Sequence, residues 1–265
     1  MKASFMKPLE KPLRTGDAGF TLLDLLVVLA VIAILIILQL PALAGGKSQS
    51  KIGMCASHVR QIALACQIYA NDNRDRLPVF SGGAAWAWDL PALAADALLK
   101  SGAQTNAFYC PGTAPRFTDQ DNWIASGSSS LWNYFGAGNS HIIGYTLTFS
   151  VPGSLVNSTN QNTTLLPETI KIGSTPVPAP AASERVLLAD ATLSTGAILP
   201  GYTHPGNNYV AISGGFYKPH VSPHLKGNIP AGGNLGFKDG HVAWRKFELM
   251  TPRTASGTGG PPFWW

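Results

Sequence analysis

The sequence predicts an α+β fold, in which a long N-terminal helix packs on an antiparallel β-sheet head with loop-rich insertions. Residues 20–40 are almost uniformly apolar, and residues 52–69 carry an apolar stripe with helical spacing. Later segments alternate apolar and polar residues, which is typical of strands. The chain has 28 Gly and 20 Pro, and only 12% of its residues are charged. This composition favours a loop-rich, β-containing head over a helical bundle.

The first two segments are a basic leader over residues 1–19 and an apolar segment over residues 20–41. An apolar helix of ~20 residues is long enough to cross the ~30 Å core of a bilayer. We therefore expect a transmembrane helix whose N-terminus faces the cytoplasm, because the leader is rich in Lys and Arg. Two alternatives are a signal peptide cut near residues 41–44 and an ordinary membrane anchor. The signal peptide leaves unexplained the carboxylate of Asp24, which is costly inside an apolar helix.

The helix is predicted to continue as an amphipathic segment over residues 42–72. Its apolar residues recur at intervals of three and four and form one stripe: Ile52, Cys55, Val59, Ile62, Cys66 and Tyr69. We expect this stripe to pack on a head formed by residues 73–250. The Gly- and Pro-rich residues 251–265 are expected to form a flexible tail, unless its terminal aromatic residues dock on the head or on a partner.

Several elements of the head have local sequence signals. A short helix is expected after Trp86 and up to Lys100, followed by a strand over residues 106–110. Residues 142–151 alternate like a strand, and residues 185–190 form a buried-strand candidate. The Asp239-Gly240 pair lies between two strand-like runs and predicts a hairpin over residues 235–247.

The junction Gly19-Phe20, with a carboxylate at Asp24, resembles the processing signature of type IV pilins and type II secretion pseudopilins. This resemblance implies a pilin-like fold, cleavage after Gly19 by a prepilin peptidase, and N-methylation of Phe20. It also implies that Asp24 pairs with the terminal amine of a neighbouring subunit, although the family usually has Glu at this place. Pro41 stands where related pilins carry a helix-breaking proline, so we expect a kink there.

Three further motifs are similar to the planctomycete- and verrucomicrobial-type group of large pseudopilins: residues 55–64, residues 108–111 and residues 236–242. The last contains an Asp-Gly pair that the group places after a His, for which His224 is the candidate. The resemblance implies a structural subunit of a secretion or pilus-like filament, with a prepilin peptidase, other subunits and an inner-membrane assembly platform as partners. It implies a single-pass protein of the inner membrane, whose C-terminal head lies in the periplasm or on the cell surface.

The alternative function is a surface-displayed adhesin whose aromatic residues bind glycans. The candidates are Trp86, Trp88, Trp123, Trp132, Tyr134 and Phe135. Nucleic-acid binding is not expected, because the sequence has no clustered basic stripe. Catalysis is not expected either, because the sequence has neither a nucleophile elbow nor a phosphate-binding loop.

The three cysteines restrict the disulfides that the chain can form. Cys55 and Cys66 are eleven residues apart on one predicted helix, which separates their Cα atoms by ~16 Å, too far for a disulfide. Cys110 therefore pairs with one of them, or all three thiols stay free. The resemblance favours Cys55–Cys110. Because the cysteines are scattered, we do not expect them to bind a metal.

A group of acidic and histidine residues remains in the head: Asp190, His204, His220, His224, Asp239 and His241. Their spacing matches no zinc template. Asp239 is expected to be a turn residue, and Asp190 a hydrogen-bonding residue at a strand end. Related pseudopilins can carry structural calcium on loop oxygens, which makes Asp190 and Asp239 the candidate ligands here. No other cofactor is expected.

Overall fold

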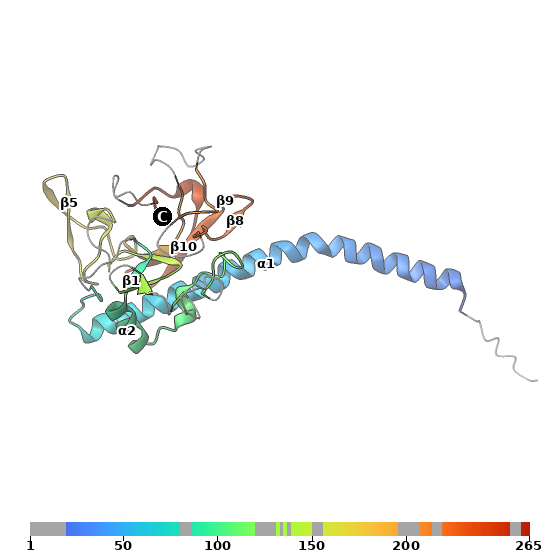
Figure 1. Cartoon of the computed structure of the whole chain (residues 1–265), viewed down its shortest axis with the longest axis horizontal. Helices are drawn as coiled ribbons and strands as arrows, with labels where there is room; N and C mark the ends of the chain where they lie inside the picture. The colour runs from blue at the N-terminus through green and yellow to red at the C-terminus, as the bar shows by residue number, and fades with distance from the viewer. Residues whose placement is uncertain are drawn as a thin grey trace, which may run out of the picture. The chain divides into compact units, whose positions relative to one another are not determined.

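The computed structural model describes residues 20–79, 86–119, 131–132, 135–136, 139–149, 156–195, 207–213, 219–254 and 261–265. The side chains of residues 39–44, 135–136 and 158 are outside this description. The chain divides into two compact units, Met1–Gly46 and Lys47–Trp265 (Figure 1). We refer to them as the N-terminal unit and the C-terminal unit.

The long helix α1 spans Leu22–Asp72 and ends where the amphipathic pattern predicts. It continues through position 41 as one helix. Among the described residues, no helix combines the length and the apolarity needed to cross a membrane. The prediction of a transmembrane helix over residues 20–41, and with it the single-pass inner-membrane location, is therefore wrong.

The C-terminal unit is α+β, and the strand pairs formed by its described residues are all antiparallel. Its main sheet has the order β11-β10-β7-β4, formed by Val242–Lys246, Gly232–Phe237, Val186–Asp190 and Tyr145–Leu147. A second sheet has the order β1-β3-β2, formed by Asp89–Pro91, Ser140–Ile142 and Phe135–Gly136. Two small hairpins pair β5 with β6 and β8 with β9, formed by Thr169–Ile172, Thr175–Pro178, Leu225–Lys226 and Ile229–Pro230.

Short helices complete the unit. Among the residues that the structure describes, helix α2 spans Ala92–Lys100, and three 3-10 helices span Thr105–Phe108 (η1), Ser158–Asn160 (η2) and Phe247–Leu249 (η3). The predicted helix before Lys100, the strand at residues 185–190 and the Asp-Gly hairpin are confirmed. The strand predicted over residues 106–110 is wrong, because η1 covers most of that segment.

The C-terminal half of α1 packs along strand β10. Cys55, Val59 and Ile62 are fully buried, as the apolar stripe predicts. A Cβ atom on Gly236 would lie 2.9 Å from Val59 Cγ1 and 2.7 Å from Leu188 Cδ2, so glycine permits this close helix–sheet approach. The amide of Asn234 also donates to the carbonyl of Ile52 over 3.1 Å. This contact brings the helix residue Cys55 to the end of strand β7.

The last residues of the chain pack into the C-terminal unit. Phe263, Trp264 and Trp265 are each at most 2% exposed. Bridges join Leu193 to Phe263 and Pro252 to Trp264. The sequence predicted a flexible tail unless these aromatic residues dock, and they do dock. The reason is the burial of three large rings, which offsets the entropy of ordering the segment.

His220 is a fully buried histidine between two aromatic rings. Its ring stacks on Phe117 with centroids 4.0 Å apart and on Trp88 with centroids 5.1 Å apart. Burial lowers the pKa of His220 to about 4, although hydrogen bonds to the backbone at Val221 and Ile143 oppose this shift. His220 is therefore neutral in the folded protein at pH values where it titrates in the unfolded chain.

The low pKa of His220 makes stability depend on pH. Between pH 6.5 and pH 4 the unfolded chain binds the proton that folded His220 does not, so stability is lost as the pH falls through this range. We expect His220→Phe to remove about 2 kcal/mol of that loss between pH 6.5 and 4.5. The measurement is the free energy of unfolding of both proteins in urea at several pH values. Parallel pH curves for the two proteins would contradict the prediction.

Candidate metal centre

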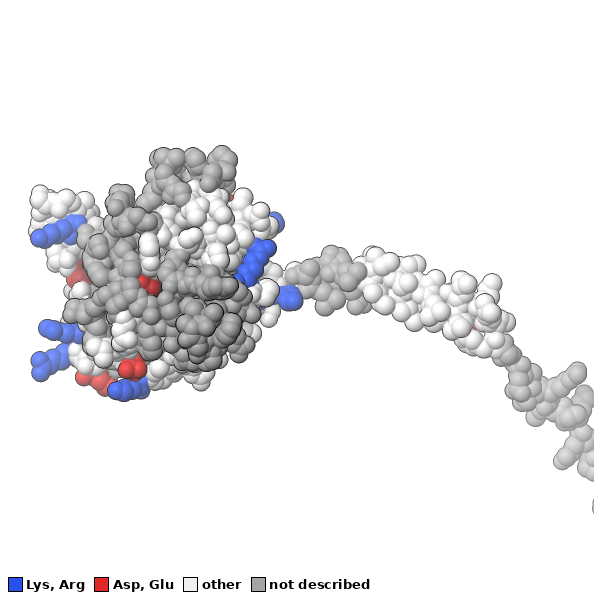
Figure 2. All heavy atoms as spheres, in the orientation of Figure 1, with Lys and Arg blue, Asp and Glu red and all other residues white. Residues whose placement is uncertain are grey.

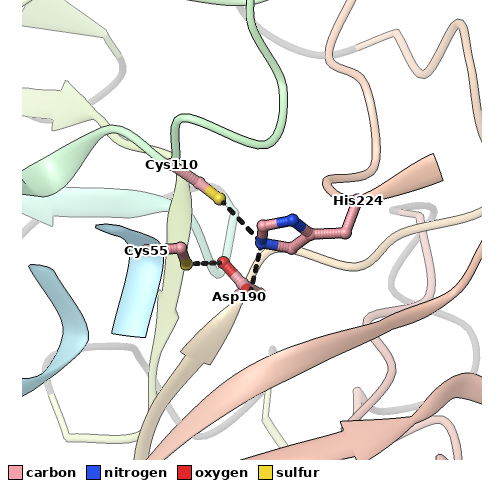
Figure 3. Close-up of side chains that lie close together, drawn as sticks. All are labelled: Cys55, Cys110, Asp190 and His224. Carbon is pink, nitrogen blue, oxygen red and sulfur yellow. Dashed lines mark hydrogen bonds and ion pairs between the residues drawn. The ribbon is translucent and has the colours of Figure 1, made fainter. Parts of the chain in front are cut away.

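Four buried side chains from four separate segments meet beside the end of strand β7 (Figure 3). Cys55 comes from α1, Cys110 from the segment after η1, Asp190 from the last position of β7 and His224 from the position before β8. One ligand atom from each residue lies within 4.8 Å of all the others. This group, which we call the four-residue centre, could hold a metal ion.

Asp190 is at the middle of the centre. Its Oδ1 accepts a hydrogen bond from Cys55 Sγ over 3.0 Å, and its Oδ2 lies 3.4 Å from His224 Nε2. The backbone N–H of Asn234, in β10, donates to Oδ2 over 2.7 Å. Strand β10 therefore holds the carboxylate through Asn234, while α1 contacts it through Cys55 and the segment before β8 contacts it through His224.

Cys110 and His224 are brought together by a close loop contact. Cys110 Sγ lies 3.4 Å from His224 Nε2, and the Gly112 N–H donates to the same sulfur over 3.3 Å. A Cβ on Gly112 would lie 2.6 Å from the His224 ring, so glycine lets the loop pass against the imidazole. His224 itself has a φ of 52°, in the left-handed region that only a minority of non-glycine residues adopt.

Burial and hydrogen bonding shift the pKa values of two groups in the centre. Burial raises the pKa of the Cys110 thiol, and the hydrogen bond to Cys55 and the charge of Asp190 act in the same direction. Burial alone would lower the pKa of His224, but its bonds to Asp190 and Cys55 outweigh this effect and raise it to about 9.

The two aspartates expected to bind calcium have different environments. Asp190 is buried in the centre, whereas Asp239 is exposed in the β10–β11 turn and outside the group. Asp239 Oδ1 accepts the backbone N–H of His241 over 3.1 Å and contacts its Nδ1 at 2.6 Å. Calcium takes six to eight oxygen ligands, and a centre with two sulfurs and one nitrogen does not supply them.

The cysteines are free thiols in the structure. Cys55 and Cys110 both belong to the centre, so the Cys55–Cys110 disulfide stays a prediction. If it formed, the disulfide would use the two sulfurs that a metal ion would need. Cys66 is buried elsewhere on α1, and burial raises the pKa of its thiol. The expectation that the cysteines form no metal-binding group missed the centre, because its four residues have no common spacing in the sequence.

The residues predicted for processing and assembly are in the N-terminal unit. Gly19 lies outside the described residues, as does the side chain of Pro41, and Phe20 is exposed. Asp24 forms a reciprocal cap with Thr21: its Oδ2 accepts the Thr21 hydroxyl over 2.7 Å and the Thr21 N–H over 3.0 Å. The Asp24 N–H donates back to the Thr21 hydroxyl over 3.2 Å. These bonds lower the pKa of Asp24 and satisfy the first turn of α1.

The remaining predicted residues do not join the centre. His220 lies in the aromatic core, and His204 lies outside the described residues. Among the aromatic residues considered for glycan binding, Trp88 is fully buried, and Trp86 and Trp132 are half-buried. Trp123, Tyr134 and the side chain of Phe135 are outside the description.

Comparison with known protein families, curated proteins and solved structures gives no match to this chain. By its fold and its site, the chain is an α+β protein with a buried group of two cysteines, an aspartate and a histidine. Functional conclusions depend on the chemistry of the chain itself.

Proposed function

We propose that the chain is a structural subunit of a pilin-like filament, of the type II secretion or type IV pilus kind. A prepilin peptidase cuts it after Gly19, and Phe20 is then N-methylated. The observation that carries the proposal is the start of α1. The helix begins at Leu22, close behind the junction, and its large apolar side chains over residues 22–38 are 46–81% exposed.

An apolar helix of this kind needs a cover in its working state. Figure 2 displays the described part of the N-terminal unit as almost entirely uncharged, with Asp24 as the charged residue of residues 20–38. Copies of the same helix would supply a cover of matching length and chemistry, as the core of a filament. Partners in this proposal are the peptidase, other subunits and an assembly platform.

The Asp24 cap fits the same proposal. The cap leaves the carboxylate exposed at the first turn of α1, a few residues from the new N-terminus. A charged terminal amine on a neighbouring copy would find an ionised partner there, and the positive end of the helix dipole favours the negative charge. This pairing would set the register between adjacent helices.

Co-expression with a prepilin peptidase tests the proposal. We expect the intact mass of the purified protein to correspond to residues 20–265 plus one methyl group, because the peptidase cuts after Gly19 and methylates Phe20. Without the peptidase, the chain keeps residues 1–19. Mass spectrometry of the intact protein distinguishes the two forms.

Two leader variants control this measurement. Gly19→Val places a branched side chain at the cleavage site and should block cutting, whereas Gly16→Val makes the same change three residues earlier and should leave cutting intact. An uncut parent chain, in cells where the peptidase cuts a known substrate, would refute the processing step and the filament function that depends on it.

A further inference from the structure

We propose that Cys55, Cys110, Asp190 and His224 bind one zinc ion, which joins helix α1 to the main sheet and to two loops. The site is structural: four protein ligands surround the ion and leave no position open for substrate. This inference is independent of the filament proposal.

The donor set selects the metal. Two sulfurs, one imidazole nitrogen and one carboxylate oxygen make four ligands, the number that structural zinc sites use. Thiolates favour zinc over magnesium and calcium, which prefer oxygen ligands. In binding, each thiol would release its proton to solvent, and the histidine would coordinate as the neutral imidazole.

Two of the distances between donor atoms match a tetrahedral site, and all of the donor atoms lie within 4.8 Å of one another. With Zn–N and Zn–S bonds of ~2.0–2.3 Å, the ligand atoms of a tetrahedron lie ~3.3–3.8 Å apart. Cys110 Sγ and Asp190 Oδ2 are each 3.4 Å from His224 Nε2. The sulfur and the carboxylate oxygen both face the same nitrogen of the His224 ring, as ligands around one metal ion do. In a catalytic triad the nucleophile and the carboxylate face opposite nitrogens of the ring.

Burial supports a closed site. The exposed fractions of the four residues are 0% for Cys55, 2% for Cys110, 1% for Asp190 and 7% for His224. Taking so many polar groups out of water is costly unless they are paired or bind a metal. A zinc ion would compensate all four groups at once.

Groups outside the ligand set orient the ligands. The Asn234 N–H holds Asp190, the Gly112 N–H contacts Cys110 Sγ, and Tyr145 Oη lies 3.6 Å from Cys55 Sγ. The indole of Trp244 packs edge-on against the His224 ring at 5.3 Å. Such second contacts fix ligand orientation in zinc sites, and their loss typically costs ~10–100-fold in metal affinity.

The test is metal titration of the full chain in mild detergent, after reduction and removal of metal with a chelator. We expect one Zn²⁺ per chain by elemental analysis and a higher thermal unfolding temperature with Zn²⁺ than without. Co²⁺ in place of Zn²⁺ should give the intense visible bands of tetrahedral cobalt and a thiolate-to-metal charge-transfer band in the ultraviolet. Cobalt bands of an octahedral, all-oxygen site would overturn the proposal.

Two buried cysteines, Cys110 inside the centre and Cys66 outside it, provide the matched variants. Cys110→Ser should weaken Zn²⁺ binding on the order of 100-fold and abolish the charge-transfer band contributed by this sulfur. Cys66→Ser changes a buried thiol outside the centre and should keep full binding. Equal binding by parent and Cys110→Ser would overturn the proposal. If Cys110→Ser does not fold, the cobalt spectrum of the parent chain decides the question.

The disulfide is the competing outcome. A parent chain that takes up no Zn²⁺ or Co²⁺ after full reduction, and that forms a Cys55–Cys110 disulfide in air, would refute the zinc site. A failure of peptidase processing would leave this result unchanged, so the two proposals can fail separately.

Discussion

Replacing Arg185 with methionine is expected to lower the free energy of unfolding of the C-terminal unit by about 3 kcal/mol or more. Arg185 is 5% exposed, and its Nε donates to Asn162 Oδ1 over 2.9 Å. The two terminal nitrogens donate to the carbonyls of Thr159 and Gln161. Methionine retains much of the volume but removes the donor from the buried Asn162 side chain and from the partly buried carbonyls of Thr159 and Gln161. The midpoint of urea unfolding measures the loss.

Arg185 also belongs to a charged group, which suggests the controls. Its guanidinium lies 3.7 Å from the carboxylate of Glu168, which also accepts a hydrogen bond from Lys238 over 2.9 Å. Arg185→Lys keeps the charge but cannot reach all three acceptors, so we expect an intermediate loss. Arg116→Met changes an exposed arginine and should stay within ~0.5 kcal/mol of the parent. Equal losses for the two methionine variants would contradict the prediction.

Trp264→Ala is expected to cost about 3–5 kcal/mol, because it leaves a cavity the size of an indole near the end of the chain. The ring is 1% exposed and lies 5.7 Å from the ring of Phe247. Its Nε1 donates to Ser194 Oγ over 2.9 Å. The loss should appear as a lower thermal unfolding temperature and as faster proteolysis of residues 251–265.

Two substitutions calibrate the Trp264 result. Trp264→Phe keeps most of the packed ring but loses the bond to Ser194, so its cost should be clearly smaller. Leu249→Ala removes a side chain that is 68% exposed and should change little. A Trp264→Ala protein as stable as Leu249→Ala would mean that the C-terminal segment does not dock in solution.

Local signals predicted local elements. The Asp239-Gly240 turn, the strand that ends at Asp190 and the helix before Lys100 each depend on a few adjacent residues, and each is present. The strand predicted over residues 106–110 is absent, and the 3-10 helix η1 covers most of that segment. The cap that Thr21 and Asp24 form at the start of α1 was not predicted.

The four-residue centre could not be predicted from spacing. Zinc motifs are recognisable when two ligands share one turn or one helix. Here the contact between Cys55 and Asp190 joins residues 135 positions apart, and the contact between Cys110 and His224 joins residues 114 positions apart. Only the packing of α1 on the sheet brings these residues together.

The pairing of distant segments also bears on how fast the C-terminal unit folds. The Ile52–Asn234 bond joins positions 182 apart, and the Gln67–Lys238 bond joins positions 171 apart. Closing such long loops must precede the contacts that stabilise them, which slows folding to the millisecond-to-second range typical of topologies rich in non-local contacts. Since β10 and β11 lie far downstream of α1 in the sequence, α1 emerges from the ribosome long before its partner sheet exists. The nascent chain therefore exposes the apolar stripe of α1 until β10 has been made, and exposed apolar surface of this kind is prone to aggregation.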